Sequence, residues 1–319
     1  MTEVQNFSKK LVANIENVII GKHGAIELMI VNLLCQGHLL IEDVPGVGKT
    51  MMARSLARSI GLSFNRIQFT PDMLPSDVTG VSIFNQASRD FEFRQGPLFA
   101  QVILADEINR ATPKTQAALL EAMEEGQVSV DGITHILPDP FMVLATQNPI
   151  EYEGTFALPE AQLDRFFMRI RLGYPDFESE VNVLNSQQYQ HPFEKLEQVV
   201  SLEEVKKMQE AVKDVFVADA VREYIVSVVR ETRQHSDAYL GASTRGSLTL
   251  FRAVQAKAIM DGRDYALPDD VKALTDACLS HRIILGPSAR LGEVTAESII
   301  DDVLEKVKVP TGTYTPVAN

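Results

Sequence analysis

One short segment constrains the fold of this chain more than any other: Pro45-Gly46-Val47-Gly48-Lys49-Thr50 lies between an apolar run and a helical pattern. A strand, a glycine-rich turn and a helix in this order form a phosphate-binding loop. The glycines let backbone N–H groups surround phosphate oxygens, the lysine binds the β- and γ-phosphates, and the threonine hydroxyl binds Mg²⁺. The alternative interpretation is a surface turn before an ordinary helix.

Position 43 departs from the strict form of this motif. The pattern G-x-x-x-x-G-K-[ST] has glycine where this chain has Asp43. An acidic side chain close to bound phosphates would repel them. Asp43 is therefore compatible with a phosphate loop only if its carboxylate points away from it.

Apolar runs and helical patterns alternate through the first half of the chain. Two amphipathic helices over residues 3–36 come first. We then expect strands and helices in the order 38–41 (strand), 49–60 (helix), 64–69 and 101–105 (strands), 113–125 (helix) and 141–146 (strand). Strands separated by helices pair in parallel, so this part predicts a doubly wound α/β sheet.

Two pairs of short β-prone runs interrupt this alternation. One pair covers residues 81–84 and 91–93, and the other covers 128–130 and 134–136 around Asp131-Gly132. Asp-Gly between such runs is a strong hairpin signal. Both pairs are predicted to be hairpin insertions in the α/β core.

The second half of the chain is predicted to be helical. Gly173-Tyr174-Pro175-Asp176 ends the sheet pattern, and no convincing strand follows it. Helices are expected at 176–190, 201–214, 219–235, 243–261, 268–281 and 294–307. We therefore divide the chain into an α/β domain at 1–172, an all-α domain at 173–308 and a flexible tail at 309–319.

Polar side chains follow two of the predicted strands. Asp106 and Glu107 end the strand at 101–105, and Asn148 lies just beyond the strand at 141–146. Ligands of parallel α/β sheets bind at the carboxyl ends of the strands. Asp106, together with Thr50, is predicted to hold Mg²⁺, Glu107 to polarise the attacking water, and Asn148 to bind that water and the γ-phosphate.

Composition narrows the class of protein further. The 319 residues carry a net charge of −13, which disfavours nucleic acid as a partner because binding to it is driven by Lys and Arg. We find no membrane span, no secretory signal and no metal-ligand spacing among the six histidines. Two widely separated cysteines in apolar patterns suggest free thiols, so we expect a cytoplasmic protein.

The long motifs resemble those of the AAA+ ATPases, and more specifically of the MoxR family. The stretches are IEDVPGVGKT, QGPLFAQVILADEINRATPKTQAALLEAMEEGQVSVDG, ATQNPIEYEGTFALPEAQLDRF and GASTRGSLTLFRA, and the resemblance covers about residues 5–305. It implies an AAA+ P-loop core with a parallel sheet, hairpin insertions and a helical lid. The family often carries an acidic residue at position 43; at Thr244 it usually has proline.

The resemblance also implies roles that spacing alone does not give. Arg165 matches the arginine finger that reaches the γ-phosphate of the neighbouring subunit, although Arg169 and Arg171 are also candidates. Arg245 matches the sensor-2 arginine, which acts on the nucleotide of its own subunit. Ile19 and Ile20 would line the adenine pocket, and the loop residues up to Met51 would bind the nucleotide, ATP or ADP.

The activity implied is Mg²⁺-dependent ATP hydrolysis in a ring, hexameric by this resemblance. The ring would act as a chaperone or remodelling motor in maturation, assembly or metal insertion of a partner complex, often one with a von Willebrand factor A domain. Phe84, Arg89 and Phe91 of the first hairpin would touch a client or simply pack. A magnesium-chelatase-like motor subunit, a nucleotide-gated scaffold with little turnover, and a nucleic-acid motor remain alternatives.

Overall fold

Two helices that pack on each other begin the structure, α1 (Thr2–Glu16) and α2 (His23–Leu34). The computed structural model describes residues 2–148, 154–292, 294–312 and 314–315. Residues 149–153 of the stretch ATQNPIEYEGTFALPEAQLDRF and the end of the predicted tail lie outside these residues. Within them, no helix is long and apolar enough to cross a membrane.

Five parallel strands form the central sheet, in the order β2-β5-β8-β1-β9. They are β1 (Leu39–Glu42), β2 (Phe64–Gln68), β5 (Val102–Asp106), β8 (Met142–Gln147) and β9 (Met168–Ile170). Sequence analysis predicted the first four within one residue at each end. It missed β9, because a run of three residues is too short to show a periodic pattern.

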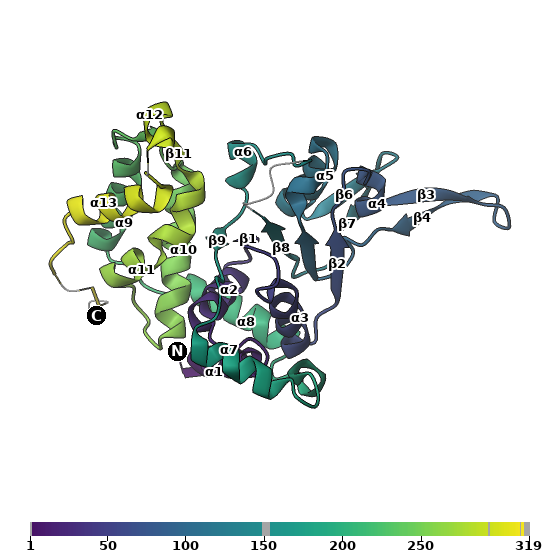
Figure 1. Cartoon of the computed structure of the whole chain (residues 1–319), viewed down its shortest axis with the longest axis horizontal. Helices are drawn as coiled ribbons and strands as arrows, with labels where there is room; N and C mark the ends of the chain where they lie inside the picture. Colours follow the sequence, from purple (N-terminus) through teal and green to yellow (C-terminus); the bar gives the residue numbers. More distant parts are fainter. Residues whose placement is uncertain (1, 149–153, 293, 313, 316–319) are drawn as a thin grey trace.

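Helices cover both faces of this sheet (Figure 1). Leu39 and Ile41 belong to a core shared with α1, α2 and α3 (Lys49–Ile60), whereas Leu40 between them belongs to a second core. That second core includes residues of α4 (Pro75–Thr79) and α5 (Pro113–Glu125). Strands buried on both faces are continuous apolar runs, which is why they were visible in the sequence.

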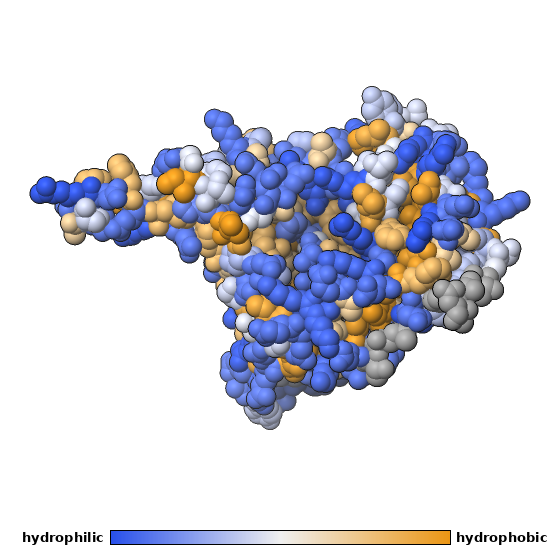
Figure 2. Space-filling model, turned by 180° about the vertical axis from the view of Figure 1, so that it is seen from behind, coloured by the Kyte–Doolittle hydropathy of each residue, from blue (hydrophilic) through white to orange (hydrophobic). Residues whose placement is uncertain are grey.

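Both predicted hairpins are present. The first consists of β3 (Gly80–Asn85) and β4 (Asp90–Gln95), and the second of β6 (Gln127–Val130) and β7 (Ile133–Ile136). Asp131 and Gly132 have φ values of 52° and 78°, as a two-residue type I′ turn requires. The β3–β4 hairpin projects far from the body (Figure 1), with hydrophobic residues behind a hydrophilic tip (Figure 2).

The second half of the chain is mainly helical, with helices where the sequence predicted them. Helices α7 (Phe177–Ser186) and α8 (Leu202–Lys213) lie beside α1, α2 and α3 (Figure 1). The helices that follow are α9 (Asp219–Thr232), α10 (Thr244–Met260), α11 (Pro268–Leu279) and α13 (Ala296–Lys306), and α10 also packs against α1, α2 and α8. The domain boundary at residue 173 remains a proposal based on the sequence.

One small sheet in this half corrects the expectation that no strand follows residue 173. Strands β10 (Ala238–Leu240) and β11 (Ile284–Leu285) pair antiparallel. Strands of three and two residues leave no pattern in the sequence. The remaining short elements are η1 (Ile108–Arg110), α6 (Glu160–Leu163), η2 (Pro192–Lys195), η3 (Ser280–Arg282) and α12 (Pro287–Leu291).

Candidate nucleotide-binding site

The predicted phosphate loop connects β1 to α3. Gly46 and Gly48 have φ values of 87° and 97°, which glycine adopts without strain. The space at Gly46 is open, since a Cβ added there would meet no atom within 4 Å. Lys49 and Thr50 form the first turn of α3, so the N-terminus of this helix adjoins the loop. Glycines with positive φ beside a helix N-terminus suit a phosphate group.

Asp43 directs one carboxylate oxygen, Oδ2, away from this loop, while Oδ1 accepts a hydrogen bond from the N–H of Val44 at the start of the loop. The side chain is buried, and its Oδ2 accepts hydrogen bonds from the backbone N–H groups of Leu172 and Gly173 at 2.6 Å each. The Nζ of Lys49 donates to the backbone carbonyl of Asp43 at 2.7 Å. The condition that we set for an acidic residue at this position is therefore met.

Asp106 and Glu107 lie at the carboxyl end of β5, and a residue of the neighbouring strand holds both. Thr146 on β8 is fully buried; its hydroxyl donates to Oδ1 of Asp106 at 2.6 Å and accepts from the N–H of Glu107 at 2.8 Å. Sequence analysis missed Thr146. The available signal was a polar residue at the end of an apolar strand.

The backbone of Glu107 is left-handed, with φ 57° and ψ 49°. Non-glycine residues in this region are strained, and such residues cluster at functional sites. The Oε2 of Glu107 accepts from Gln68 Nε2 at 2.8 Å and pairs with Arg110 at 3.2 Å. Gln68 is a second site residue that the sequence did not reveal, because its proximity arises from the pairing of β2 with β5.

The remaining predicted nucleotide contacts lie around the same edge. Asn148 directly follows β8 and is buried. The Cδ1 of Ile19 lies 3.9 Å from the position that a Cβ on Gly48 would take, so this side chain adjoins the phosphate loop. Ile20 is half-buried next to it in sequence. Val47 and Met51 pack against the core beneath the loop, and Pro45 is exposed.

Arg165 and Arg245 lie together, but not at this edge. Their guanidinium groups bind the two oxygens of Glu124, Arg165 at 3.0 Å and Arg245 at 2.9 Å. Arg165 precedes β9, whereas the phosphate loop follows β1, and the two strands are parallel. The pair therefore lies at the amino ends of the strands, whereas the phosphate loop lies at their carboxyl ends, about 13 Å away along a strand. This placement does not fit the implied role of Arg245 in its own subunit's site.

The other two finger candidates are engaged within the chain. Arg169 and Arg171 both pair with Glu42 Oε2, at 3.1 Å and 2.9 Å, and with Glu297 of α13, at 2.5 Å and 3.0 Å. Arg169 is 14% exposed. These arginines join the end of β1 to the helical half. Among the described residues, the ion pair of Arg165 is with Glu124, which lies at the same end of the strands, so Arg165 is the finger candidate that we retain.

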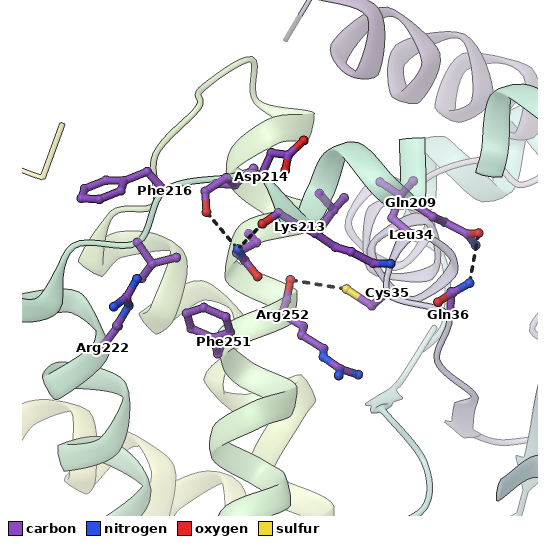
Figure 3. A pocket seen from close by; sticks show the side chains of 14 residues that line it. Leu34, Cys35, Gln36, Gln209, Lys213, Asp214, Phe216, Arg222, Phe251 and Arg252 are labelled. Atoms are coloured by element: carbon purple, nitrogen blue, oxygen red, sulfur yellow. Dashed lines mark hydrogen bonds between the residues drawn. The ribbon is translucent and has the colours of Figure 1, made fainter. Parts of the chain in front are cut away.

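A cavity of about 630 Å³ lies elsewhere, between α2, α8, α9 and α10 (Figure 3). Its wall includes Cys35, Phe216, Phe251 and Arg252, and Cys35 Sγ donates to the backbone carbonyl of Arg252 at 3.4 Å. None of the predicted site residues lines it.

Comparisons with known proteins agree with these features. Residues 38–168 match the model of the ATPase family associated with various cellular activities (AAA), and residues 230–303 match an AAA lid domain. The chain is 54% identical to YeaC of Bacillus subtilis over 94% of both proteins. It is 41% identical to Chaperone MoxR1 of Mycobacterium tuberculosis, over 95% of this chain and 82% of that protein.

The chain belongs to the MoxR family of AAA+ ATPases.

A solved structure supports the same family. The crystal structure of a candidate ATPase from Cytophaga hutchinsonii aligns with 97% of this chain and 96% of its own, with a TM-score of 0.89 and 39% identity. The parallel sheet and helical second half are thus the AAA+ core and helical lid of a MoxR-family protein, as the sequence motifs implied.

Proposed function

We propose that this MoxR-family chain hydrolyses ATP with Mg²⁺ at the edge of the sheet that carries the phosphate loop. The observation that carries the proposal is the Thr146 hydroxyl, which holds Asp106 and Glu107 together at that edge. Asp106 and Thr50 would hold Mg²⁺, which would supply positive charge to offset that of the phosphates. Lys49 and the loop N–H groups bind phosphate, Glu107 orients and polarises the water, and Asn148 positions it.

The arginines complete the site of a neighbouring subunit in this proposal. Arg165 and Arg245 form one pair on the edge opposite their own phosphate loop, so one subunit would present both to the nucleotide of the next. Guanidinium groups offset the charge that develops on a transferred phosphoryl group, and an arginine finger contributes about 10³–10⁵ in rate. A ring, hexameric by the family resemblance, follows from a site built in this way.

Hydrolysis would drive remodelling of a partner complex. The projecting β3–β4 hairpin carries Phe84 and Phe91, which are 50% and 69% exposed and pack edge to face at 5.4 Å. Exposed aromatic pairs are typical of contact surfaces. We propose that this hairpin contacts the client, and that maturation, assembly or metal insertion of a complex with a von Willebrand factor A domain is the task. A magnesium-chelatase-like subunit is the alternative.

The test is ATP turnover per subunit as the protein concentration is raised, with Arg165→Ala and Glu107→Gln proteins alongside. A shared site predicts that specific activity rises with concentration. It also predicts that adding Arg165→Ala protein to wild type inhibits beyond simple dilution, and that Glu107→Gln abolishes turnover. Turnover that is independent of concentration contradicts a shared site. Bound ATP with negligible turnover that Glu107→Gln leaves unchanged identifies a nucleotide-gated scaffold instead.

A further inference from the structure

Asp43 stands where the strict phosphate-loop motif has its first glycine. The backbone conformation at this position does not require glycine. Its φ is not among the positive values of the described residues. Its carboxylate accepts hydrogen bonds from three backbone N–H groups. That of Val44 bonds Oδ1 at 2.8 Å, and those of Leu172 and Gly173 bond Oδ2 at 2.6 Å each. Hydrogen bonds to an ionised carboxylate are short and about twice as strong as neutral ones. The side chain is thus a firm link to the segment that leads out of the sheet.

The backbone of Asp43 is linked to the chemistry of the site. Its carbonyl accepts from Lys49 Nζ at 2.7 Å, and its N–H donates to the carbonyl of Gln147 at 3.1 Å, next to Asn148. Asp43 therefore contacts the phosphate-binding lysine, the end of β8 next to Asn148, and the segment that follows β9. A displacement of Lys49 toward a phosphate would break its hydrogen bond to the Asp43 carbonyl.

Glu42, the preceding residue, extends this link to the lid. It is 17% exposed and pairs with Arg169 and Arg171, which in turn pair with Glu297 in the first turn of α13. The Arg169 pairs have little solvent exposure and hold their geometry more firmly than surface pairs, whereas Arg171 is 56% exposed and contributes less. The two acidic residues before the loop therefore connect it both to residues 169–173 and to a lid helix.

We propose that Asp43 is a positioning residue that transmits the state of the phosphate loop to the Leu172-Gly173 segment and, with Glu42, to helix α13. Strand β9 lies between Leu172 and Arg165, so a shift at one end of this short strand also moves the segment that carries the finger. The inference rests on the proposed function, because it concerns how the nucleotide site of one subunit controls its lid and its finger. A glycine at position 43 would keep the backbone contacts with Lys49 and Gln147 but would lose the carboxylate link to Leu172 and Gly173.

The experiment uses the full chain with Asp43→Ala, Asp43→Asn and Lys49→Ala variants. Affinity for a fluorescent ADP, kcat and KM for ATP, and hydrogen exchange of the α13 amides with and without nucleotide are measured. The Asp43 carboxylate bonds Val44, Leu172 and Gly173 rather than α13. A change in the hydrogen exchange of α13 therefore reports coupling to the phosphate loop rather than the loss of a direct bond. Thermal unfolding of each variant establishes that it is folded.

We expect Asp43→Ala to bind ADP within about threefold of wild type, because the loop glycines and Lys49 remain. Its kcat should fall tenfold or more at nearly unchanged KM, and the nucleotide-dependent change in α13 exchange should be lost. Asp43→Asn, whose amide oxygen can still accept, should be intermediate. A wild-type exchange response in a folded Asp43→Ala protein overturns the coupling while leaving the proposed function in place. A wild-type protein that binds ADP no better than Lys49→Ala overturns both.

Discussion

The guanidinium of Arg66 donates two hydrogen bonds to one oxygen of Asp106, from Nε at 3.1 Å and from Nη2 at 2.6 Å. Arg66 lies on β2 and Asp106 ends β5, and the two strands pair side by side. The other oxygen of Asp106 accepts from Thr146. The carboxylate that we assign to Mg²⁺ is thus already paired with a cation of the protein itself.

Arg66→Gln should therefore lower the Mg²⁺ concentration needed for half-maximal turnover. A positive charge that competes for Asp106 is removed, and a unit charge at this range contributes roughly 1 kcal/mol or more, equivalent to a change of about fivefold or more. The measurement is a Mg²⁺ titration of ATP turnover at fixed ATP. Arg110→Gln, which removes the partner of Glu107 instead, serves as the matched control. A higher Mg²⁺ requirement in Arg66→Gln would show that Arg66 assists the ion.

The sequence predicted the phosphate loop, the Asp106-Glu107 strand and both hairpins, because each of these features is determined by residues that are close together in the sequence. Apolar strands, glycines and Asp-Gly turns leave local patterns. Strand β9 and the β10–β11 pair were too short to leave one. The fold of the core could therefore be predicted almost completely, and its shortest strands could not.

Contacts through space were beyond the reach of the sequence. Thr146, Gln68 and Arg66 meet the two carboxylates only because β8 and β2 flank β5. The role of Arg245 that the resemblance implied stays a prediction, and its pairing with Glu124 beside Arg165, 80 positions away, could not be read from the sequence. The sequence showed Asp43 as a departure from the motif. The orientation of its carboxylate could not be predicted, because it depends on the position of the Leu172 and Gly173 N–H groups in the fold.

Thr146→Val should lower kcat with little effect on KM for ATP. The substitution keeps the shape of the side chain but removes the hydroxyl that holds Asp106 Oδ1 and the N–H of Glu107. A misplaced catalytic group costs about 10²-fold, so we expect a loss of 10- to 100-fold in steady-state turnover. Thr146→Ser, which retains the hydroxyl, should recover most of the rate. Equal losses in both variants would mean that packing of the methyl group matters rather than the hydroxyl.

Arg282→Ala should destabilise the protein strongly. The side chain is 2% exposed and donates to Asp164 Oδ1 at 2.7 Å and to the carbonyl of Phe166 at 2.8 Å, which ties η3 of the lid to the segment carrying Arg165. Burial and the adjacent guanidinium hold the pKa of His281 well below its usual value, so this neighbour stays neutral. Removing one member of a fully buried ion pair costs about 3–5 kcal/mol; because Asp164 is 25% exposed, we expect a loss toward the lower end of that range.

Urea unfolding measures this loss, with Arg245→Ala as the control. Arg245 also pairs with an acidic residue, Glu124, but it is 47% exposed. Exposed pairs contribute at most about 1 kcal/mol, so the control should unfold close to wild type. Similar unfolding of the two variants would mean that the Arg282 contacts contribute little to the attachment of the lid.

His38 should make the stability of the fold depend on pH. It precedes β1, and burial lowers its pKa from 6.5 to about 4. Its Nε2 bonds the carbonyl of Met123 at 2.9 Å, while Nδ1 accepts from the N–H of Val143 at 3.1 Å, a pattern that only the neutral ring can satisfy. Protonation would turn the accepting nitrogen into a donor and leave two N–H groups facing each other.

The sign of the effect follows from proton uptake. Above pH 6.5 the ring is neutral in both the folded and the unfolded chain, so it adds no pH dependence. Between pH 6.5 and about 4 only the unfolded chain binds the proton, so the free energy of unfolding decreases as the pH falls, by about 3 kcal/mol in total. Denaturant unfolding of wild type and His38→Asn across this range measures it. The difference in free energy of unfolding between wild type and His38→Asn should decrease by that amount on acidification. A difference that stays constant would mean that His38 does not contribute to the loss of stability in acid.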